Sequence, residues 1–134
     1  MAGVDAEIAY RLREPVNLDA LQRLFAASWP EGQPKSSYER VLDRAFTWVT
    51  AHDRGELIGF VNIAWDGGVH FFLLDTTVAP SHRGQGVGRH LVETAIEACR
   101  GHGEWIHVDA DEALMDRLYW PAGFGVAYAG VRKL

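Results

Sequence analysis

Apolar residues recur at helical spacing in two stretches of the first half of the chain. The first stretch covers residues 18–29, and Asn17 is placed to act as its N-cap. The second covers residues 38–46, where Ser36 and Glu39 have the spacing of a capping box. Steps of three and four residues place apolar side chains on one face of a helix, so we predict two amphipathic helices here.

Alternating or continuous apolar runs, separated by turn residues, predict strands elsewhere in the chain. These runs cover residues 7–13, 47–51, 57–65, 69–78, 105–109 and 124–132. The run at 57–65 is apolar on both faces, as expected of a central strand, and Asp-Gly-Gly at 66–68 is typical of a hairpin. A short helix is expected from Asp111 or Glu112 to near Tyr119. The polar, turn-rich segment 29–35 is predicted to be a loop, with or without a role in substrate contact.

Composition indicates an ordinary globular protein and changes the picture little. The chain has 134 residues, of which 48% are hydrophobic and 23% charged, so we expect a single domain over residues 1–134. No apolar run approaches the roughly 20 residues that cross a bilayer, and the first residues lack the pattern of a secretion signal. We therefore expect a cytoplasmic protein with no membrane partner. The net charge of −5 argues against a nucleic-acid partner.

The segment from Val78 to Arg89 is dense in glycine and joins a predicted strand to a predicted helix that ends near Cys99. Glycines at 84, 86 and 88 would each cost about 1 kcal/mol relative to alanine inside a helix. They instead let the backbone adopt positive φ and approach a ligand closely. A helix N-terminus also offers unpaired N–H groups to an anion. The segment therefore predicts a phosphate cradle, with a merely flexible connection as the alternative.

Two motifs carry a resemblance to a known family. Arg-Gly-Gln-Gly-Val-Gly at 83–88 resembles the acyl-CoA motif Arg/Gln-x-x-Gly-x-Gly/Ala of the GCN5-related N-acetyltransferases (GNAT). Leu-Tyr-Trp-Pro-Ala-Gly-Phe at 118–124 resembles the closing signature of the same family. The resemblance implies a GNAT-like α/β fold, in which helices flank a mixed sheet in the order βααβββαβαβ. It also implies acetyl-CoA as cosubstrate.

The resemblance further implies which residues hold the coenzyme. Backbone groups near Thr76, Thr77 and Val78 would hold the thioester where the fourth and fifth strands diverge. Arg83 and the N–H groups of residues 85–89 would hold the pyrophosphate, with a surface salt bridge as the alternative role for Arg83. The expected coenzyme-binding residues are Thr76, Thr77, Val78, Arg83, Gly84, Gln85, Gly86, Val87, Gly88 and Arg89.

Tyr119 matches the family tyrosine that lies beside the sulfur of CoA. A tyrosine hydroxyl, with an unperturbed pKa of about 10, can donate a proton as the C–S bond breaks. We therefore predict that Tyr119 is the general acid. The alternative is a tyrosine whose ring packs in the core and whose hydroxyl only satisfies a hydrogen bond.

The general base is less well specified. Asp75 lies at the cleft end of its predicted strand and is our first candidate, although simple alternation puts it on the face opposite Thr76. A β-bulge could reverse that placement. Asp109 is a second candidate. His107 and Asp111 also lie near the end of the facing strand, where a cap or turn role is the alternative.

Other reactive residue types predict no further chemistry. The six histidines are scattered without metal-ligand spacing, so we expect no metal. Cys99 falls on an apolar helical stripe and is interpreted as a core residue. Trp29 and Trp120 are the tryptophans expected to line an acceptor pocket or a dimer surface.

These observations favour an N-acetyltransferase that moves an acetyl group from acetyl-CoA to a primary amine by direct attack. The amine would belong to a small molecule or a peptide, and the sequence does not identify it. A non-catalytic acyl-CoA-binding or regulatory domain is the main alternative, and a partner-binding module that binds no CoA is the third. A homodimer is possible.

Overall fold

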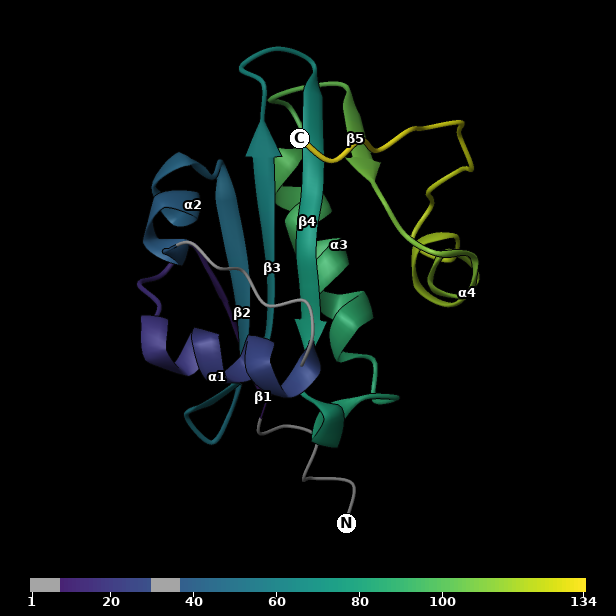
Figure 1. Ribbon diagram of the computed structural model, residues 1–134. Coiled ribbons are helices and arrows are strands. Elements are labelled where there is room, and N and C mark those ends of the chain that lie inside the picture. The colour runs from purple at the N-terminus through teal and green to yellow at the C-terminus, as the bar shows by residue number, and fades with distance from the viewer. Residues whose placement is uncertain (1–7, 30–36) are drawn as a thin grey trace.

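The computed structural model describes residues 8–29 and 37–134, in which one five-stranded sheet is flanked by helices (Figure 1). Residue 7 of the first predicted strand, Ser36 and most of the predicted 29–35 loop lie outside the described residues. The elements are β1 (Ile8–Leu12), α1 (Leu18–Ser28), α2 (Tyr38–Arg44), β2 (Thr47–Asp53), β3 (Glu56–Trp65), β4 (His70–Val78), the 3-10 turn η2 (Pro80–His82), α3 (Val87–Cys99), β5 (Trp105–Val108), α4 (Glu112–Leu114) and the π-helical turn η3 (Met115–Tyr119). The predicted α/β class and the order βααβββαβα are confirmed.

The sheet changes character at β4. Strands β1 to β4 form an antiparallel meander, whereas β4 and β5 are parallel and are joined through α3. The parallel pairing covers only residues 70–73 of β4 and residues 105–108 of β5. From Leu74 onward no described residue pairs with β4 on that side. The sheet is therefore split at the C-terminal half of β4.

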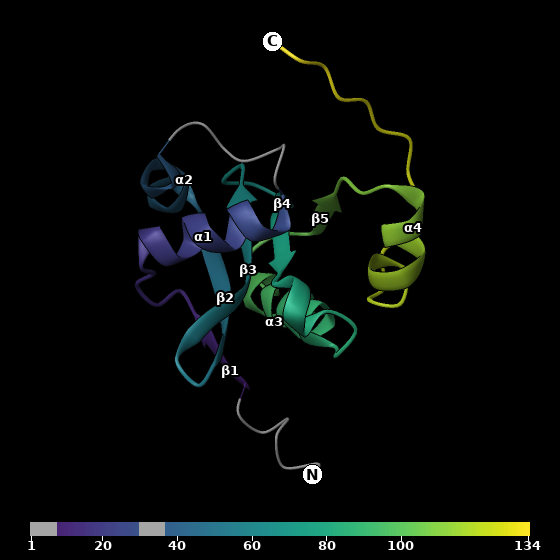
Figure 2. The ribbon, with the colours of Figure 1, turned by 60° about the horizontal axis from the view of Figure 1, so that its bottom comes forward.

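Two layers of helices cover the sheet, with α1 and α2 on one face and α3 on the other (Figure 2). The larger core lies between α3 and the sheet, and its buried residues are Val49, Ala51, Ile58, Val61, Ile63, Phe71, Leu73, Val87, Leu91, Val92, Ala95, Cys99 and Tyr119. The smaller core under α1 and α2 contains Leu21, Leu24, Phe25, Tyr38 and Phe60. Because both faces are covered, β3 is buried along most of its length, as its apolar sequence predicts.

Several residues that the sequence predicts to begin or end helices do so in the structure. The Asn17 side chain accepts a hydrogen bond from the Ala20 N–H at 3.0 Å and caps α1. The Asp111 side chain caps α4 in the same way, through the Leu114 N–H at 2.8 Å. Gly101 has φ +84° just beyond α3, which is the left-handed conformation that favours glycine at this position.

The strand predicted over residues 124–132 is wrong. Residues 124–134 form no strand, and the side chains of Val126, Tyr128 and Val131 are at least 80% exposed. A strand is stable only when its backbone is paired and its side chains pack on a neighbour. This segment is interrupted by Gly125 and Gly130, which supply no side chain for packing.

The second helix is shorter than its apolar spacing predicts. It ends at Arg44, and Ala45 is already extended with ψ 142°. The Phe46 N–H then donates to the Ile63 carbonyl at 2.8 Å. The Phe46 ring packs against Phe71 on the α3 face, at 5.0 Å between ring centroids, instead of under α2. Pairing with β3 therefore overrides helical periodicity at this point.

No described helix has the length and apolar character that crossing a membrane would require.

Replacing glycine by alanine should have opposite effects on stability at Gly59, which faces α3, and at Gly88, within α3. A Cβ on Gly59 of β3 would lie 3.0 Å from Leu91 Cδ1 and 3.1 Å from Ala51 Cβ, so α3 packs closely on the sheet there. A Cβ on Gly88 would make only ordinary contacts, the nearest at 3.6 Å to Val78.

We therefore expect Gly59→Ala to lower the free energy of unfolding by about 1–3 kcal/mol through overpacking. Gly88→Ala should raise it by up to about 1 kcal/mol, because alanine favours the helix. Urea denaturation followed by circular dichroism measures both. Equal effects of the two substitutions would contradict this description of the α3 packing.

Candidate active site

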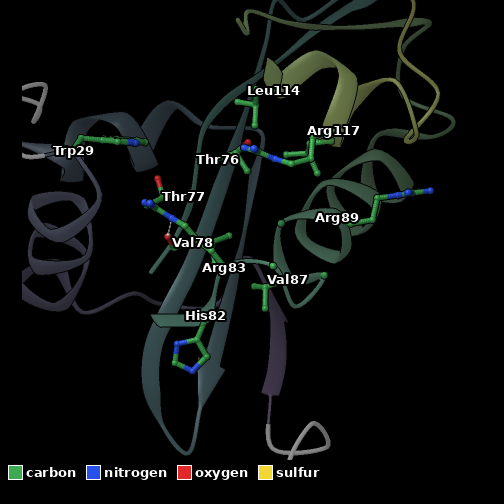
Figure 3. A pocket seen from close by; sticks show the side chains of 14 residues that line it. Trp29, Thr76, Thr77, Val78, His82, Arg83, Val87, Arg89, Leu114 and Arg117 are labelled. Atoms are coloured by element: carbon green, nitrogen blue, oxygen red, sulfur yellow. Dashed lines mark hydrogen bonds between the residues drawn. The ribbon is translucent and has the colours of Figure 1, made fainter. Parts of the chain in front are cut away.

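A cavity of about 650 Å³ opens at the C-terminal end of β4 and is within the size range of small-molecule sites (Figure 3). Four segments line it: the end of α1, the end of β4, the glycine turn with the start of α3, and the α4–η3 turn. The lining residues are Trp29, Thr76, Thr77, Val78, His82, Arg83, Gly84, Gly86, Val87, Gly88, Arg89, Leu114, Arg117 and Leu118. Most of the residues predicted to bind coenzyme therefore line one cavity.

The glycine turn presents free backbone N–H groups to this cavity. Gly84 and Gly86 have φ of +76° and +82°, which L-residues with side chains rarely adopt. Gly86 is the N-cap of α3, and the His90 N–H donates to its carbonyl at 3.1 Å. The N–H groups of residues 87–89 therefore precede the hydrogen-bond ladder of the helix. Together with the positive end of the helix dipole, they form a site suited to a phosphate.

Three arginines line the cavity, but their side chains are placed differently. Arg83 Nε donates to the Val78 carbonyl at 3.1 Å, which ties this side chain to the end of β4. Arg89 Nε donates to Glu93 Oε1 at 2.6 Å, and its guanidinium points away from the cavity in Figure 3. Arg117 extends from η3 on the opposite wall. Neither Arg83 nor Arg117 forms an ion pair with a described residue, so their charges are available to an anion.

Side-chain hydrogen bonds fasten the glycine turn to the sheet. His82 Nε2 lies 2.7 Å from Asp53 Oδ2 at the end of β2, and His82 Nδ1 lies 2.8 Å from Ser81 Oγ. The short turn η2 is thereby tied to the β2–β3 hairpin. His82 therefore holds the glycine turn in place and also lines the cavity.

Tyr119 lies beside the cavity and does not line it. Its side chain is 3% exposed, and its hydroxyl donates to Thr76 Oγ1 at 3.0 Å. Burial raises the pKa of the Tyr119 hydroxyl, and the hydrogen bond with Thr76 offsets part of that rise. The hydroxyl is therefore protonated at neutral pH and is bonded to a residue that does line the cavity. The π-helical turn η3 ends at this tyrosine, and such turns are frequent at functional sites.

Asp75 also does not line the cavity, and its side chain points to the face of β4 opposite that of Thr76. Its carboxylate accepts a hydrogen bond from the Tyr38 hydroxyl at 2.7 Å, on the α1–α2 side of the sheet. Thr76, by contrast, bonds Tyr119 on the α3 side. Asp111 caps α4, which is the structural role left open for it, and Asp109 is exposed.

The sequence analysis missed part of the cavity wall. Leu114 and Arg117 line it although no motif identified them, and Leu118 lines it although the closing signature that begins with it gave it no role. Gln85 of the glycine motif does not line the cavity. Steps of three and four residues place these side chains on one side of a helical turn, as Figure 3 shows for the first two. That spacing, next to the predicted Tyr119 site, is the signal that could have found them.

Among residues 8–29 and 37–134, no three histidine, cysteine, aspartate or glutamate side chains gather as a metal ion would require. Cys99 is 7% exposed within the larger core, and burial raises the pKa of its thiol to about 11. Its placement matches the core role predicted for it.

Comparison with known proteins identifies the family. The model of the acetyltransferase (GNAT) family matches residues 18–124, which include both sequence motifs and every residue that lines the cavity. The chain therefore belongs to the GNAT family of acetyltransferases, whose members use acetyl-CoA.

A sequence relative agrees with this assignment, and solved structures share the fold. The chain is 34% identical over 108 residues to a mycothiol acetyltransferase of Nocardia farcinica, which covers 75% of this chain. It spans only 36% of the length of that relative. A GNAT-family acetyltransferase of Streptococcus pneumoniae TIGR4 has the same fold, with a TM-score of 0.81 at 22% identity over 95% of this chain and 97% of that one. Glucosamine-6-phosphate N-acetyltransferase of Arabidopsis thaliana gives a TM-score of 0.74 at 12% identity, over 94% and 98% of the two chains.

Arg117 leads to a testable prediction about the cavity. We expect Arg117→Gln to raise the Kd for acetyl-CoA about tenfold, because a hydrogen bond from a charged group to an anion contributes more than a neutral one. Isothermal titration calorimetry measures the change. Arg100→Gln, at the exposed end of α3, is the matched control and should leave the Kd unchanged. An unaltered Kd for Arg117→Gln would show that this side chain does not contact the coenzyme.

Proposed function

We propose that this chain transfers an acetyl group from acetyl-CoA to a primary amine. The observation that carries the proposal is the continuity of the cavity. One wall holds free N–H groups at the start of α3, and the cavity extends from there to Thr76, which is hydrogen bonded to Tyr119. A diphosphate at the first point and a thioester at the second would be held by one rigid frame. Holding two reactants in this way supplies much of the rate of such a transfer.

In this proposal the glycine turn and Arg83 hold the pyrophosphate of the coenzyme, and residues 76–78 direct the thioester into the gap beside β5. The proteins named above include a mycothiol acetyltransferase and, with the same fold, a glucosamine-6-phosphate N-acetyltransferase. The name of the second states transfer to nitrogen, which supports an amine as acceptor here. For this chain the acceptor is proposed only as a primary amine on a small molecule or a peptide.

Direct attack of the amine on the thioester, without a covalent enzyme intermediate, is the mechanism that we favour. The neutral amine attacks the carbonyl carbon, the C–S bond breaks, and the amine loses its surplus proton to a base. The one thiol of the chain, Cys99, is buried, does not line the cavity and keeps its proton because its pKa is raised. It is therefore unsuited to act as a nucleophile.

Tyr119 is proposed as the source of the proton for the departing thiolate. Its raised pKa keeps the hydroxyl protonated at neutral pH, as an acid must be. Because the hydroxyl already donates to Thr76 Oγ1, we propose that the threonine hydroxyl passes the proton from Tyr119 to the sulfur. Asp75 is proposed as the base that accepts the proton of the amine.

The cradle is tested by adding a negative charge at its centre. Acetyl-CoA should raise the Tm of the wild-type protein, and Gly86→Glu should abolish that rise because the carboxylate repels the diphosphate. Gly67→Glu is a closely matched control, since Gly67 also has φ +82° and no neighbour within 4 Å of a Cβ. It carries the same backbone strain and charge but lies in the β3–β4 turn.

A retained Tm rise in Gly86→Glu, or a rise lost equally in Gly67→Glu, would contradict the cradle. Release of free CoA thiol with a panel of amines then tests transfer. A protein that binds acetyl-CoA and releases no thiol with any amine would instead be the acyl-CoA-binding domain.

The proposed acid is tested by Tyr119→Phe. This substitution keeps the ring packed against Phe124 and removes only the hydroxyl. We expect kcat to fall about 10²-fold, within the range that a general acid contributes, and the Kd for acetyl-CoA to stay unchanged. Tyr128→Phe, at an exposed tyrosine of the C-terminal segment, should change neither. An unchanged kcat in Tyr119→Phe would assign the proton to another group.

A further inference from the structure

A β-bulge in β4 determines the direction of the Asp75 side chain. Leu74 pairs with Asn62 of β3, and Thr77 pairs with Phe60, so two residues of β4 lie opposite one residue of β3. Asp75 is the first of the two and has φ +58°, a conformation that few residues other than glycine adopt. Strain of this kind persists only where the surroundings hold it in place, and it gathers at functional sites.

Two buried side chains hold the Asp75 carboxylate. The Asn62 amide donates to the Tyr38 hydroxyl, and that hydroxyl donates to Asp75 Oδ2 at 2.7 Å. A longer contact of 3.5 Å joins Asn62 Nδ2 to the same oxygen. Asn62 and Tyr38 are 1% and 8% exposed, so the two donors are fixed by packing. Burial and the charge of Asp75 raise the pKa of the Tyr38 hydroxyl, which therefore remains a donor.

Among the described residues, one oxygen of this carboxylate accepts no hydrogen bond and its charge has no ion-pair partner. Both hydrogen bonds reach Oδ2, and Oδ1 accepts none from the described residues. No arginine, lysine or histidine of the described part forms an ion pair with Asp75. A partly buried carboxylate that is held only by neutral donors is electrostatically complementary to a cation.

Apolar side chains lie next to Asp75 on the same face of the sheet. Phe72 and Leu74 of β4 are 41% and 39% exposed, so helices α1 and α2 leave this part of the sheet uncovered. On the neighbouring strand β5, Trp105 is 59% exposed and the His107 ring stacks on Phe72. This strip, defined by Phe72, Leu74, Trp105 and His107, runs along the sheet up to the bulge. It carries no acidic or permanently cationic side chain of its own.

We propose that Asp75 binds the ammonium group of the acceptor, which is a monoamine whose apolar or aromatic part lies along the strip. Tyr38 and Asn62 are positioning residues that hold the Asp75 carboxylate. The ammonium would reach Oδ1 from the α1–α2 face, while the coenzyme lies in the cavity at the C-terminal end of β4, against the start of α3. The two substrates would then meet in the gap where the pairing of β4 with β5 ends. The bound ammonium first loses one proton through Asp75 to solvent water, which restores the carboxylate, and the neutral amine then attacks the thioester carbon. As the C–S bond breaks, Asp75 accepts the surplus proton from the nitrogen, and the thiolate takes its proton from the Tyr119–Thr76 pair, which is reprotonated from solvent.

This inference rests on the proposed acetyl transfer, and its test separates the two. Wild-type protein is assayed with acetyl-CoA and either 2-phenylethylamine, spermidine or glucosamine, while acetyl-CoA binding is measured in parallel. We expect kcat/KM to be at least tenfold higher for 2-phenylethylamine than for the other two amines, because only 2-phenylethylamine carries an aromatic ring that can pack on the apolar strip. Higher values for spermidine or glucosamine would overturn the assigned acceptor class. Loss of acetyl-CoA binding itself would overturn the proposed function instead.

Two substitutions test the carboxylate and its support. Asp75→Asn keeps a side chain that tolerates positive φ and removes the charge. It should raise the KM for 2-phenylethylamine at least tenfold and leave the Kd for acetyl-CoA unchanged. Tyr38→Phe keeps the ring packed against Phe25 and Phe60 but removes the donor. It should raise the same KM by about tenfold.

A double-mutant cycle separates positioning from packing. If Tyr38 acts through Asp75, then Tyr38→Phe should have little further effect in the Asp75→Asn background. Equal effects of Tyr38→Phe in both backgrounds would assign Tyr38 a structural role alone. An unchanged amine KM in Asp75→Asn would overturn the ammonium site.

Discussion

The β-bulge at Asp75 and Thr76 is the constraint on which the proposed chemistry of this chain depends. It lies where the pairing of β4 with β5 has ended, so the backbone there is held by β3 on one side only. The bulge sends Asp75 toward the buried Tyr38 on one face and Thr76 toward Tyr119 on the other. In a regular strand, alternation from Leu74 would place Asp75 on the α3 face and Thr76 on the α1–α2 face, so the bulge exchanges the faces of these two polar groups.

The rest of the structure maintains that geometry. Helix α3 packs closely on β3 at Gly59, which places its N-terminal N–H groups beside the end of β4. The His82–Asp53 hydrogen bond ties the glycine turn to the neighbouring hairpin. Rigid elements therefore surround the cavity on several sides, and such support is what holds catalytic groups in a productive arrangement.

Electrostatics divides the site into two parts. The free N–H groups of α3, Arg83 and Arg117 form a positive region within a chain of net charge −5. Asp75 is the negative counterpart across β4, and neutral donors hold it without cancelling its charge. A polyanionic coenzyme and a cationic amine would thus each meet the opposite charge on its own side of the sheet.

The sequence by itself determined the order of the helices and strands up to Tyr119, the caps at Asn17 and Asp111, and the glycine turn. Each of these depends on residues a few positions apart, where periodicity and backbone preference act directly. The tertiary structure decided the partners of Asp75 and Tyr119, which lie 37 and 43 residues away along the chain. It also brought Arg117 into the cavity wall and left residues 124–134 without a strand. These outcomes depend on contacts between distant segments, and local periodicity carries no information about such contacts.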